Sequence, residues 1–481
     1  MRTFLLLFLF ISTFSFAQTQ RNTGLLFDDD AYEKTPLKAK NVAFQDVVTE
    51  FTSASLKQFV PEIKDQGGYG TCVGWASAYY GRTILEARLS NNTNHENITN
   101  ASFSPVFTYL NANVENDYNC QGGAFIGKAM EAMVEKGVPY YKDFDVMCET
   151  NFPETLLDKA KNFRIKDFTR IFGADESEDI KVDGVKRSLL NGNPVIIGFK
   201  VENAFFSAKT VYEPDNLGTD GGHAMCVIGY DDDKYGGSFE LVNSWGSSWG
   251  NEGFMWVRYA DLAKYTRYAF EMIPMKAQPT TKTTLGGEVD FVLRDKSPMN
   301  VVKGTGDYTG SVFGAQEVVI EDEEESIGDY STEESYGVGT VYRMIAKVDQ
   351  PSYVYAFGLD SDNEFSPLFP HRDSISPYIN SDKSEVMLPY APVGKRAYAK
   401  LSKDVEKEYT VVVFSLDKLD LSEVEKQLAE MEGKLLDKLY VLFKDKLISK
   451  EDMELREGKM GFNAEFEKGS MAMMILDIKR S

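Results

Sequence analysis

Residues 64–76 read KDQGGYGTCVGWA, and this stretch decides how the first half of the chain folds. Glycines and a glutamine precede Cys72, and apolar residues at helical spacing follow it to about Leu89. A thiol at a helix start lies near unpaired backbone N–H groups and the positive end of the helix dipole, which stabilise a thiolate. The pattern therefore predicts a nucleophilic cysteine at the N-terminus of a long, buried helix.

The order of the other segments indicates the fold class. Helices are expected near 104–113 and 126–136, and short β-rich runs follow at 194–199, 224–230, 239–243 and 253–257. Helices followed by strands are typical of an α+β protein with two subdomains of different type. The polar cluster at 91–97 is expected to be an exposed loop.

Length and charge limit the possible organisation and partners. A chain of 481 residues is expected to form two or three domains. The net charge of -22 argues against nucleic acid as a partner, because phosphates would be repelled.

The first residues are typical of export. Residues 1–17 combine a basic start, an apolar run and Ser15-Phe16-Ala17, which predicts a signal peptide cleaved after Ala17. No later segment is long and apolar enough to cross a bilayer, so we expect a secreted, periplasmic or extracellular protein. Residues 18–50 lack periodic apolar spacing and are expected to form an N-terminal arm, too short for a helical inhibitory prodomain.

A second domain is expected after a polar linker at 276–285. Residues 286–481 contain β-rich runs such as 352–357 and 409–414, and a capping box at Ser422 that predicts a helix. We expect a mainly β, sandwich-like domain with one or two helices. It has no cysteine, so a catalytic role is not expected, and a protein partner or surface retention is the hypothesis.

A thiolate needs a base and a group that orients the base. Of the three histidines, His223 stands at the entrance to a predicted buried strand, whereas His95 and His371 lie in polar surroundings. Asn243 ends a neighbouring strand, and its carbonyl is suited to accept a hydrogen bond from an imidazole. Taken singly, a structural histidine and a turn asparagine are the commoner interpretations.

Taken together and in order, the motifs resemble the papain-like cysteine peptidases, of the secreted bacterial type. The matching segments are 64–67 with Cys72 and 75–77, 120–123, His223, 243–246 and 249–254, which cover roughly residues 50–275. The resemblance implies a papain-like domain at 51–275 with a helical left part and a β-barrel-like right part. The segment 286–481 resembles a bacterial domain of unknown function that is appended to peptidases.

The resemblance also implies a role for each matching residue. Cys72 would be the nucleophile, His223 the general base and then acid, Asn243 the orienting group, and Gln66 a donor to the oxyanion. Gly122 and Gly123 would pair with an extended peptide substrate, and Gly222, Ala224 and Trp245 would line the same site. No cofactor and no metal ion is implied.

The chain departs from the family at two positions near the nucleophile. Val73 follows the cysteine where a tryptophan is common, and Tyr69 stands where the family has a cysteine. The family's usual disulfide from that position cannot form, so we expect Cys120 to pair with Cys148 and Cys226 to remain a packed thiol.

Three functions fit these residues. The leading hypothesis is a secreted thiol endopeptidase that acts on proteins or peptides. A papain-fold binding protein with a decayed site and a thiol transferase or amidase are the alternatives.

Overall fold

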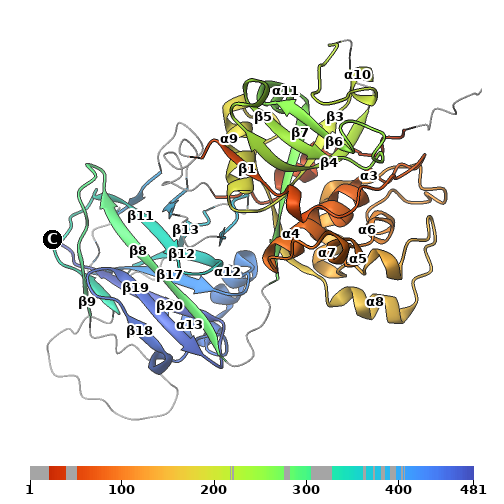
Figure 1. The fold of residues 1–481 in the computed structure, drawn as a ribbon. Coiled ribbons are helices and arrows are strands. Elements are labelled where there is room, and N and C mark those ends of the chain that lie inside the picture. The colour runs from red at the N-terminus through yellow and green to blue at the C-terminus, as the bar shows by residue number, and fades with distance from the viewer. Residues whose placement is uncertain are drawn as a thin grey trace, which may run out of the picture.

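The computed structural model describes residues 21–39, 51–216, 218, 221–275, 282–304, 328–360, 365–371, 374–380, 385–390, 397–401, 405 and 407–481. The expected signal peptide and its cleavage after Ala17 lie outside these residues. Two bodies are visible in Figure 1. The one in which the sequence predicts a peptidase, called the peptidase domain for that expectation, runs from red to green, and the C-terminal domain runs from green through teal to blue.

The peptidase domain begins with a set of helices. The stretch after Cys72 is one continuous helical segment, in which α3 (Cys72–Gly74) passes through a π-helical part (Trp75–Arg82) into α4 (Thr83–Leu89). All but a few of its side chains are buried, as expected for a helix that is apolar on most sides. The others are α5 (His95–Asn100), α6 (Pro105–Leu110), α7 (Ile126–Glu135) and α8 (Glu154–Lys161).

The expectation of a loop at 91–97 was wrong in its second half. The Asn94 side chain accepts a hydrogen bond from the backbone N–H of Asn97 and thereby caps α5. An asparagine before a short polar helix reads as a loop in sequence, although it is also a favoured N-cap residue.

The other half of the domain is a seven-stranded antiparallel sheet. Its order is β2-β7-β3-β4-β5-β6, with β1 paired to β4. The strands are β1 (Ser53–Ser55), β2 (Ile165–Arg170), β3 (Val195–Lys200), β4 (Gly222–Asp231), β5 (Ser238–Val242), β6 (Phe254–Arg258) and β7 (Thr266–Pro274), with helices α9 (Glu178–Leu190), α10 (Asn203–Phe206) and α11 (Tyr259–Tyr265). One hydrophobic core extends through both halves. The expected α+β fold class, with a helical part and a sheet part, is thereby confirmed.

The C-terminal domain is a β-sandwich. One sheet has the order β13-β12-β17-β20-β10-β9 with β14 on β12, and the other has the order β15-β11-β8-β19-β18 with β16 on β11. Their strands are β8 (Thr283–Leu293), β9 (Val301–Lys303), β10 (Tyr330–Thr332), β11 (Val341–Val348), β12 (Ser352–Asp360), β13 (Phe365–Phe369), β14 (Tyr378–Ile379), β15 (Glu385–Leu388), β16 (Ala399–Lys400), β17 (Glu408–Ser415), β18 (Met453–Leu455), β19 (Met460–Phe466) and β20 (Met471–Ile478).

Two cores hold this domain together because its central strands are buried on both faces. Alternate residues such as Val354 and Phe414 face the second sheet, whereas Tyr355 and Val413 face the helices α12 (Leu421–Glu430) and α13 (Leu435–Phe443). Strand β8 begins at Thr283, so the last positions of the predicted linker belong to the sheet. The cap of α12 is Asp420, which accepts a hydrogen bond from Glu423 N, and not the predicted Ser422.

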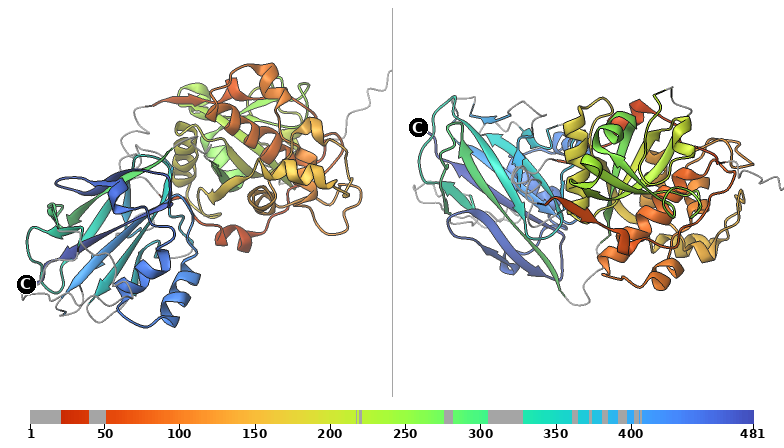
Figure 2. Two further views of the ribbon diagram at one scale, coloured as in Figure 1. Left: turned by 90° about the horizontal axis from the view of Figure 1, so that it is seen from below. Right: turned by 45° about the horizontal axis from the view of Figure 1, so that its top comes forward.

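The N-terminal arm is packed onto the peptidase domain, with α1 (Asp29–Lys34) lying beside it in the views of Figure 2. Leu25 and Tyr32 belong to the core of that domain, and the Tyr32 hydroxyl donates a hydrogen bond to Phe172 O (2.7 Å). No helix among the described residues is long and apolar enough to cross a membrane.

Candidate active site

Cys72 is the first residue of its helix, as the glycine-rich approach predicts. The helix packs against β4, and the backbone N–H of Ala224 points at the Cys72 sulfur at 3.5 Å. Its side chain is fully buried. The structure therefore brings together a thiol and the strand that carries His223, 223 − 72 = 151 positions later in the chain.

His223 is oriented by Asn243. The His223 Nε2 and Asn243 Oδ1 atoms lie 2.7 Å apart, and Asn243 Oδ1 also accepts the backbone N–H of Ser244 at 2.7 Å. An amide oxygen only accepts hydrogen bonds, so the imidazole proton must be on Nε2. The Nδ1 atom then carries a lone pair, and it has no hydrogen-bond partner among the described residues. This is the tautomer that a general base requires.

Trp245 covers the imidazole. Its ring stacks on His223 with centroids 4.4 Å apart, and Phe206 stacks at 5.2 Å from Trp245. The tryptophan is almost fully buried, so water is kept from the bond between His223 and Asn243.

Gln66 is held as a hydrogen-bond donor by a residue that the sequence analysis did not select. The Ser244 hydroxyl donates to Gln66 Oε1 (2.7 Å), which leaves Gln66 Nε2 to donate to carbonyl groups. One of these carbonyls is Tyr69 O at 2.7 Å. The position of Ser244 directly after Asn243 was the only sequence signal for this role.

The N-terminal arm lies across this site. Gln66 Nε2 donates to Asn22 O (3.0 Å), and the Trp245 indole N–H also donates to Asn22 O (3.3 Å). The backbone N–H of Gly24 is one of the groups that lower the pKa of the Cys72 thiol, against the larger effect of burial. The arm, expected as an extension, therefore contacts two of the predicted site residues, Gln66 and Trp245.

Main-chain pairing fixes the next residues of the arm. Leu25 N donates to Gly222 O (3.1 Å), Leu26 N donates to Ala124 O (3.0 Å), and Ala124 N donates to Gly24 O (2.8 Å). This is the pairing expected for a bound extended peptide.

The residue that pairs with the arm is Ala124, and the pairing of Gly122 and Gly123 with a substrate stays a prediction. The Gly123 N–H donates to the Tyr109 hydroxyl (3.1 Å), and Gly123 O accepts Val114 N (3.3 Å), so its backbone is used inside the domain. Gly123 is still needed, because its φ is +84° and a Cβ there would collide with Gly24 O. A Cβ at Gly122 would collide with the Val114 side chain and approach Asp117.

One carbonyl group of the arm contacts the residue predicted to donate to the oxyanion. The Gln66 amide holds the carbonyl of Asn22 at 3.0 Å. The Cys72 sulfur accepts a hydrogen bond from Ala224 N of β4 at 3.5 Å.

Burial favours the neutral forms of both Cys72 and His223. Loss of hydration raises the pKa of the Cys72 thiol to about 11, although several backbone N–H groups, including that of Ala224, act in the opposite direction. Burial lowers the pKa of His223 to about 4, against the effect of its bond to Asn243. A thiol and a neutral imidazole are the resting state of the covered site.

The structure joins Cys120 to Cys148 by a disulfide, and Cys72 and Cys226 are buried free thiols. Where the family has a disulfide from the position of Tyr69, this chain uses a backbone bond, Gly70 N to Cys120 O (2.8 Å). The segment before the nucleophile is thereby tied to the segment that pairs with the arm.

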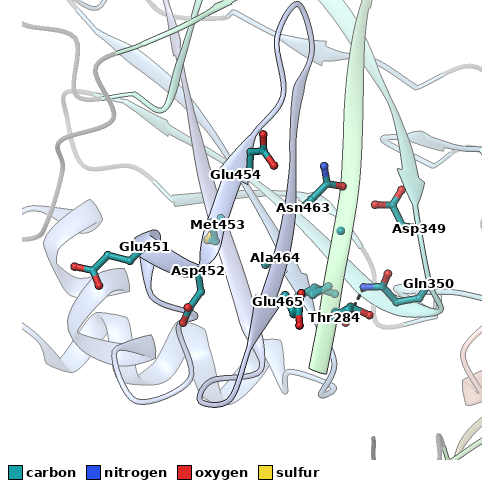
Figure 3. A pocket seen from close by; sticks show the side chains of 12 residues that line it. Thr284, Asp349, Gln350, Glu451, Asp452, Met453, Glu454, Asn463, Ala464 and Glu465 are labelled. Carbon is teal, nitrogen blue, oxygen red and sulfur yellow. Dashed lines mark hydrogen bonds between the residues drawn. The ribbon is translucent and has the colours of Figure 1, made fainter. Parts of the chain in front are cut away.

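The C-terminal domain has a surface pocket of its own, of about 460 Å³, at the ends of β8, β18 and β19 (Figure 3). Its side chains include Asp349, Glu451, Glu454 and Glu465, but none is a cysteine or histidine. The pocket shares no residue with the site around Cys72. Within the described residues no His, Cys, Asp and Glu side chains are grouped to hold a metal ion.

Comparison with known proteins agrees with this geometry. The model of the family described as papain family cysteine protease matches residues 48–271. An uncharacterized peptidase C1-like protein of Acanthamoeba polyphaga mimivirus is 30% identical over 222 residues, which are 44% of this chain and 68% of that protein.

Two further matches are more distant. Cathepsin K of Mus musculus is 27% identical over 208 residues, which are 41% of this chain and 56% of that protein, less than two thirds of its length. The solved structure of xylellain, a cysteine protease from Xylella fastidiosa, has 21% identity, covers 54% of this chain and 98% of its own, and gives a TM-score of 0.44.

Proposed function

Because the chain belongs to the papain family of cysteine proteases, we propose that it is an exported endopeptidase in which Cys72 forms an acyl-enzyme with the substrate. The observation that carries the proposal is the arrangement of Cys72, His223, Asn243 and Gln66 around one site, with a peptide segment of the chain itself bound there. Export rests on the sequence of residues 1–17.

The reaction follows from the positions of the donors and acceptors. The Cys72 thiol gives its proton to His223 Nδ1, and the sulfur attacks the carbonyl carbon of the substrate. Gln66 Nε2 and the backbone N–H of Cys72 stabilise the oxyanion. His223 then returns the proton to the leaving amine, which departs and leaves a thioester.

Hydrolysis of the thioester uses the same groups. His223 takes a proton from water as the hydroxide oxygen attacks the acyl carbon, and the thiol is restored when the carboxylic acid leaves. Asn243 keeps the ring in one orientation throughout, because its carbonyl binds the Nε2 proton in both protonation states. Proteins or peptides are the substrates, and Ala124 and Gly222 provide the main-chain pairing for them.

The chain offers a matched pair of thiols for the test, because Cys72 and Cys226 are both fully buried and free. We expect Cys72→Ala to abolish hydrolysis of a denatured protein substrate and Cys226→Ala to retain it, both measured after displacement of the arm by Leu25→Glu. An epoxide inhibitor directed at thiols should label Cys72 in the same preparation. Full hydrolysis by the Cys72→Ala variant would disprove the proposal.

A further inference from the structure

We propose that the C-terminal domain is a clamp for the N-terminal arm and thereby keeps Cys72 covered. The inference rests on the proposed function, because it concerns the regulation of the same site. The β-sandwich would bind the arm of the same chain, whereas the sequence suggested a separate protein as its partner.

The arm crosses from one domain to the other. Its residues 22–26 lie in the cleft, and α1 packs beside the sheet of the peptidase domain through Tyr32. The following residues reach the C-terminal domain, where Leu37 and Ala39 pack against the core between the two sheets of the sandwich. The cleft segment is thus continuous with a segment anchored in the other domain.

The backbone of Leu37 is bound on the side of the sandwich. Leu37 N donates to Ser374 O (2.6 Å), and Ser376 N donates to Leu37 O (2.8 Å), in a parallel bridge with Ile375. Ile375 and Ser376 are both buried. The contact is a single parallel bridge outside the two sheets, which holds the arm by its main chain.

The neighbouring arm residues are bound on the side of the peptidase domain. Arg170 N donates to Pro36 O (3.0 Å), and Lys38 N donates to Arg170 O (2.9 Å). The Arg170 side chain also donates from Nε to Thr35 O (2.8 Å). The arm therefore forms the link between β2 and the sandwich.

A buried carboxylate joins all three parts. Glu271 of β7 is nearly inaccessible, and one oxygen accepts Lys38 Nζ of the arm at 2.5 Å. Its other oxygen accepts Asn380 Nδ2 of the C-terminal domain at 3.1 Å and Asn193 Nδ2 at 3.0 Å. A buried charge is stable only while its partners are present, so loss of the sandwich would weaken the hold on Lys38.

Anchoring the arm in the C-terminal domain raises the effective concentration of residues 24–26 next to the peptidase site. The cleft holds residues 24–26 by few main-chain bonds, which are individually weak. A tether fixed at its far end keeps these residues near the cleft, which raises apparent affinity by a factor on the order of 10²–10⁴. With the clamp in place, the weakly bound residues 24–26 therefore stay bound over Cys72 for most of the time.

The test measures the rate at which iodoacetamide alkylates Cys72 in the full-length chain, with peptide mapping to separate Cys72 from Cys226. We expect Leu37→Asp to raise this rate at least about tenfold, a fraction of the tethering effect, because a charge cannot enter the apolar contact with the sandwich. Asn380→Ala, which removes one partner of Glu271, should raise it less. Leu439→Ala is the control. Leu439 is a buried residue of α13 in the core between the helices and the sheet, and it does not contact the arm.

A double variant distinguishes release of the arm from a general destabilisation of the protein. In a chain whose arm has already been displaced by Leu25→Glu, the addition of Leu37→Asp should leave the alkylation rate unchanged. An unchanged rate for Leu37→Asp alone, or an equal increase for Leu439→Ala, would overturn the proposal. Alkylation does not require peptide hydrolysis, so faster alkylation without hydrolysis would count against the proposed function and leave the clamp standing.

Discussion

The two domains use their polar groups in opposite ways. In the peptidase domain a few buried polar side chains, such as His223, Asn243 and Gln66, converge on one cleft and have partners that fix their donor and acceptor roles. In the C-terminal domain the central strands are apolar on both faces, and the acidic groups line a surface pocket. The difference teaches that the chemistry resides in one domain, while the other supplies a rigid surface for the arm.

The largest expected effect tests whether the cleft alone carries the chemistry. Gln66→Ala, made in the arm-displaced background, should lower kcat by about 10²–10³ because one oxyanion donor is lost. Gln121→Ala is its control, since Gln121 binds Gly68 O (2.8 Å) and the Asn22 side chain but donates nothing to the oxyanion. Steady-state hydrolysis of a peptide amide measures both. A Gln66→Ala enzyme with the parent kcat would remove Gln66 from the mechanism.

The next effect concerns the part of the arm that the peptidase domain holds. Leu25 is only 4% exposed, and Leu25→Glu would place an unpaired carboxylate in its pocket, at a cost of several kcal/mol. Alkylation of Cys72 should therefore accelerate by about 10², since each 1.4 kcal/mol is a factor of ten. Lys34→Glu, a charge change at an exposed position of the same arm, should leave the rate unaltered. Equal rates in the two variants would mean that the arm does not limit access.

A smaller effect follows from protonation. Burial lowers the pKa of His223 to about 4 in the covered site, whereas exposure to water returns it toward its ordinary value near 6.5. Between these values the uncovered form binds more protons, so acidification favours release of the arm. The carboxylate of Asp29, with its pKa lowered to about 2 by Arg267, stays ionised over this range and adds nothing to the shift.

The measurement compares alkylation of Cys72 in the full-length chain with that in the Leu25→Glu variant at the same pH, which cancels the reactivity of the thiol itself. The ratio of the two rates should rise by about twentyfold from pH 7 to pH 5, because pH 5 lies about 1.5 units below the ordinary pKa of the uncovered imidazole and still above that of the covered one. A ratio that does not change with pH would show that His223 is not the titrating group.

The last prediction concerns the C-terminal domain, where a destabilising substitution is expected to leave peptidase activity unchanged. Leu439→Ala should lower the free energy of unfolding of the C-terminal domain by about 2–5 kcal/mol, because it leaves a cavity under α13. The kcat of the arm-displaced enzyme should not change. Calorimetry and peptide hydrolysis give the two values, and a parallel loss of kcat would contradict the separation of roles.

The sequence predicted which residues the structure brings together in the candidate site, because they lie in short motifs with fixed chemistry. The glycines before Cys72, the strand after His223 and the turn after Asn243 each have a local signature. Ser244 and Ala124 were missed because neither residue type is unusual at its position. Their roles come from the partner atoms that folding brings to them.

The position of the arm could not be predicted for a different reason. Its contacts between Gly24 and Leu26 are made by the main chain, which leaves no side-chain pattern, and Tyr32 is buried by residues far along the chain. For the C-terminal domain, runs such as 352–357 and 409–414 correctly indicated strands. Their order in the sheets depends on long-range pairing that a single sequence does not encode locally.

The arm is held over Cys72 mainly by main-chain bonds, so its sequence can change at some positions and not at others. Gly24 is fixed, because a Cβ would overlap Gly70 O, and Leu25 is fixed by its pocket. Thr23 and Leu26 have partly exposed side chains, and Leu26 is held through its backbone N–H. A library randomised at these two positions should therefore yield many functional covers, so that latency can be conserved in related chains whose arms look unrelated by sequence.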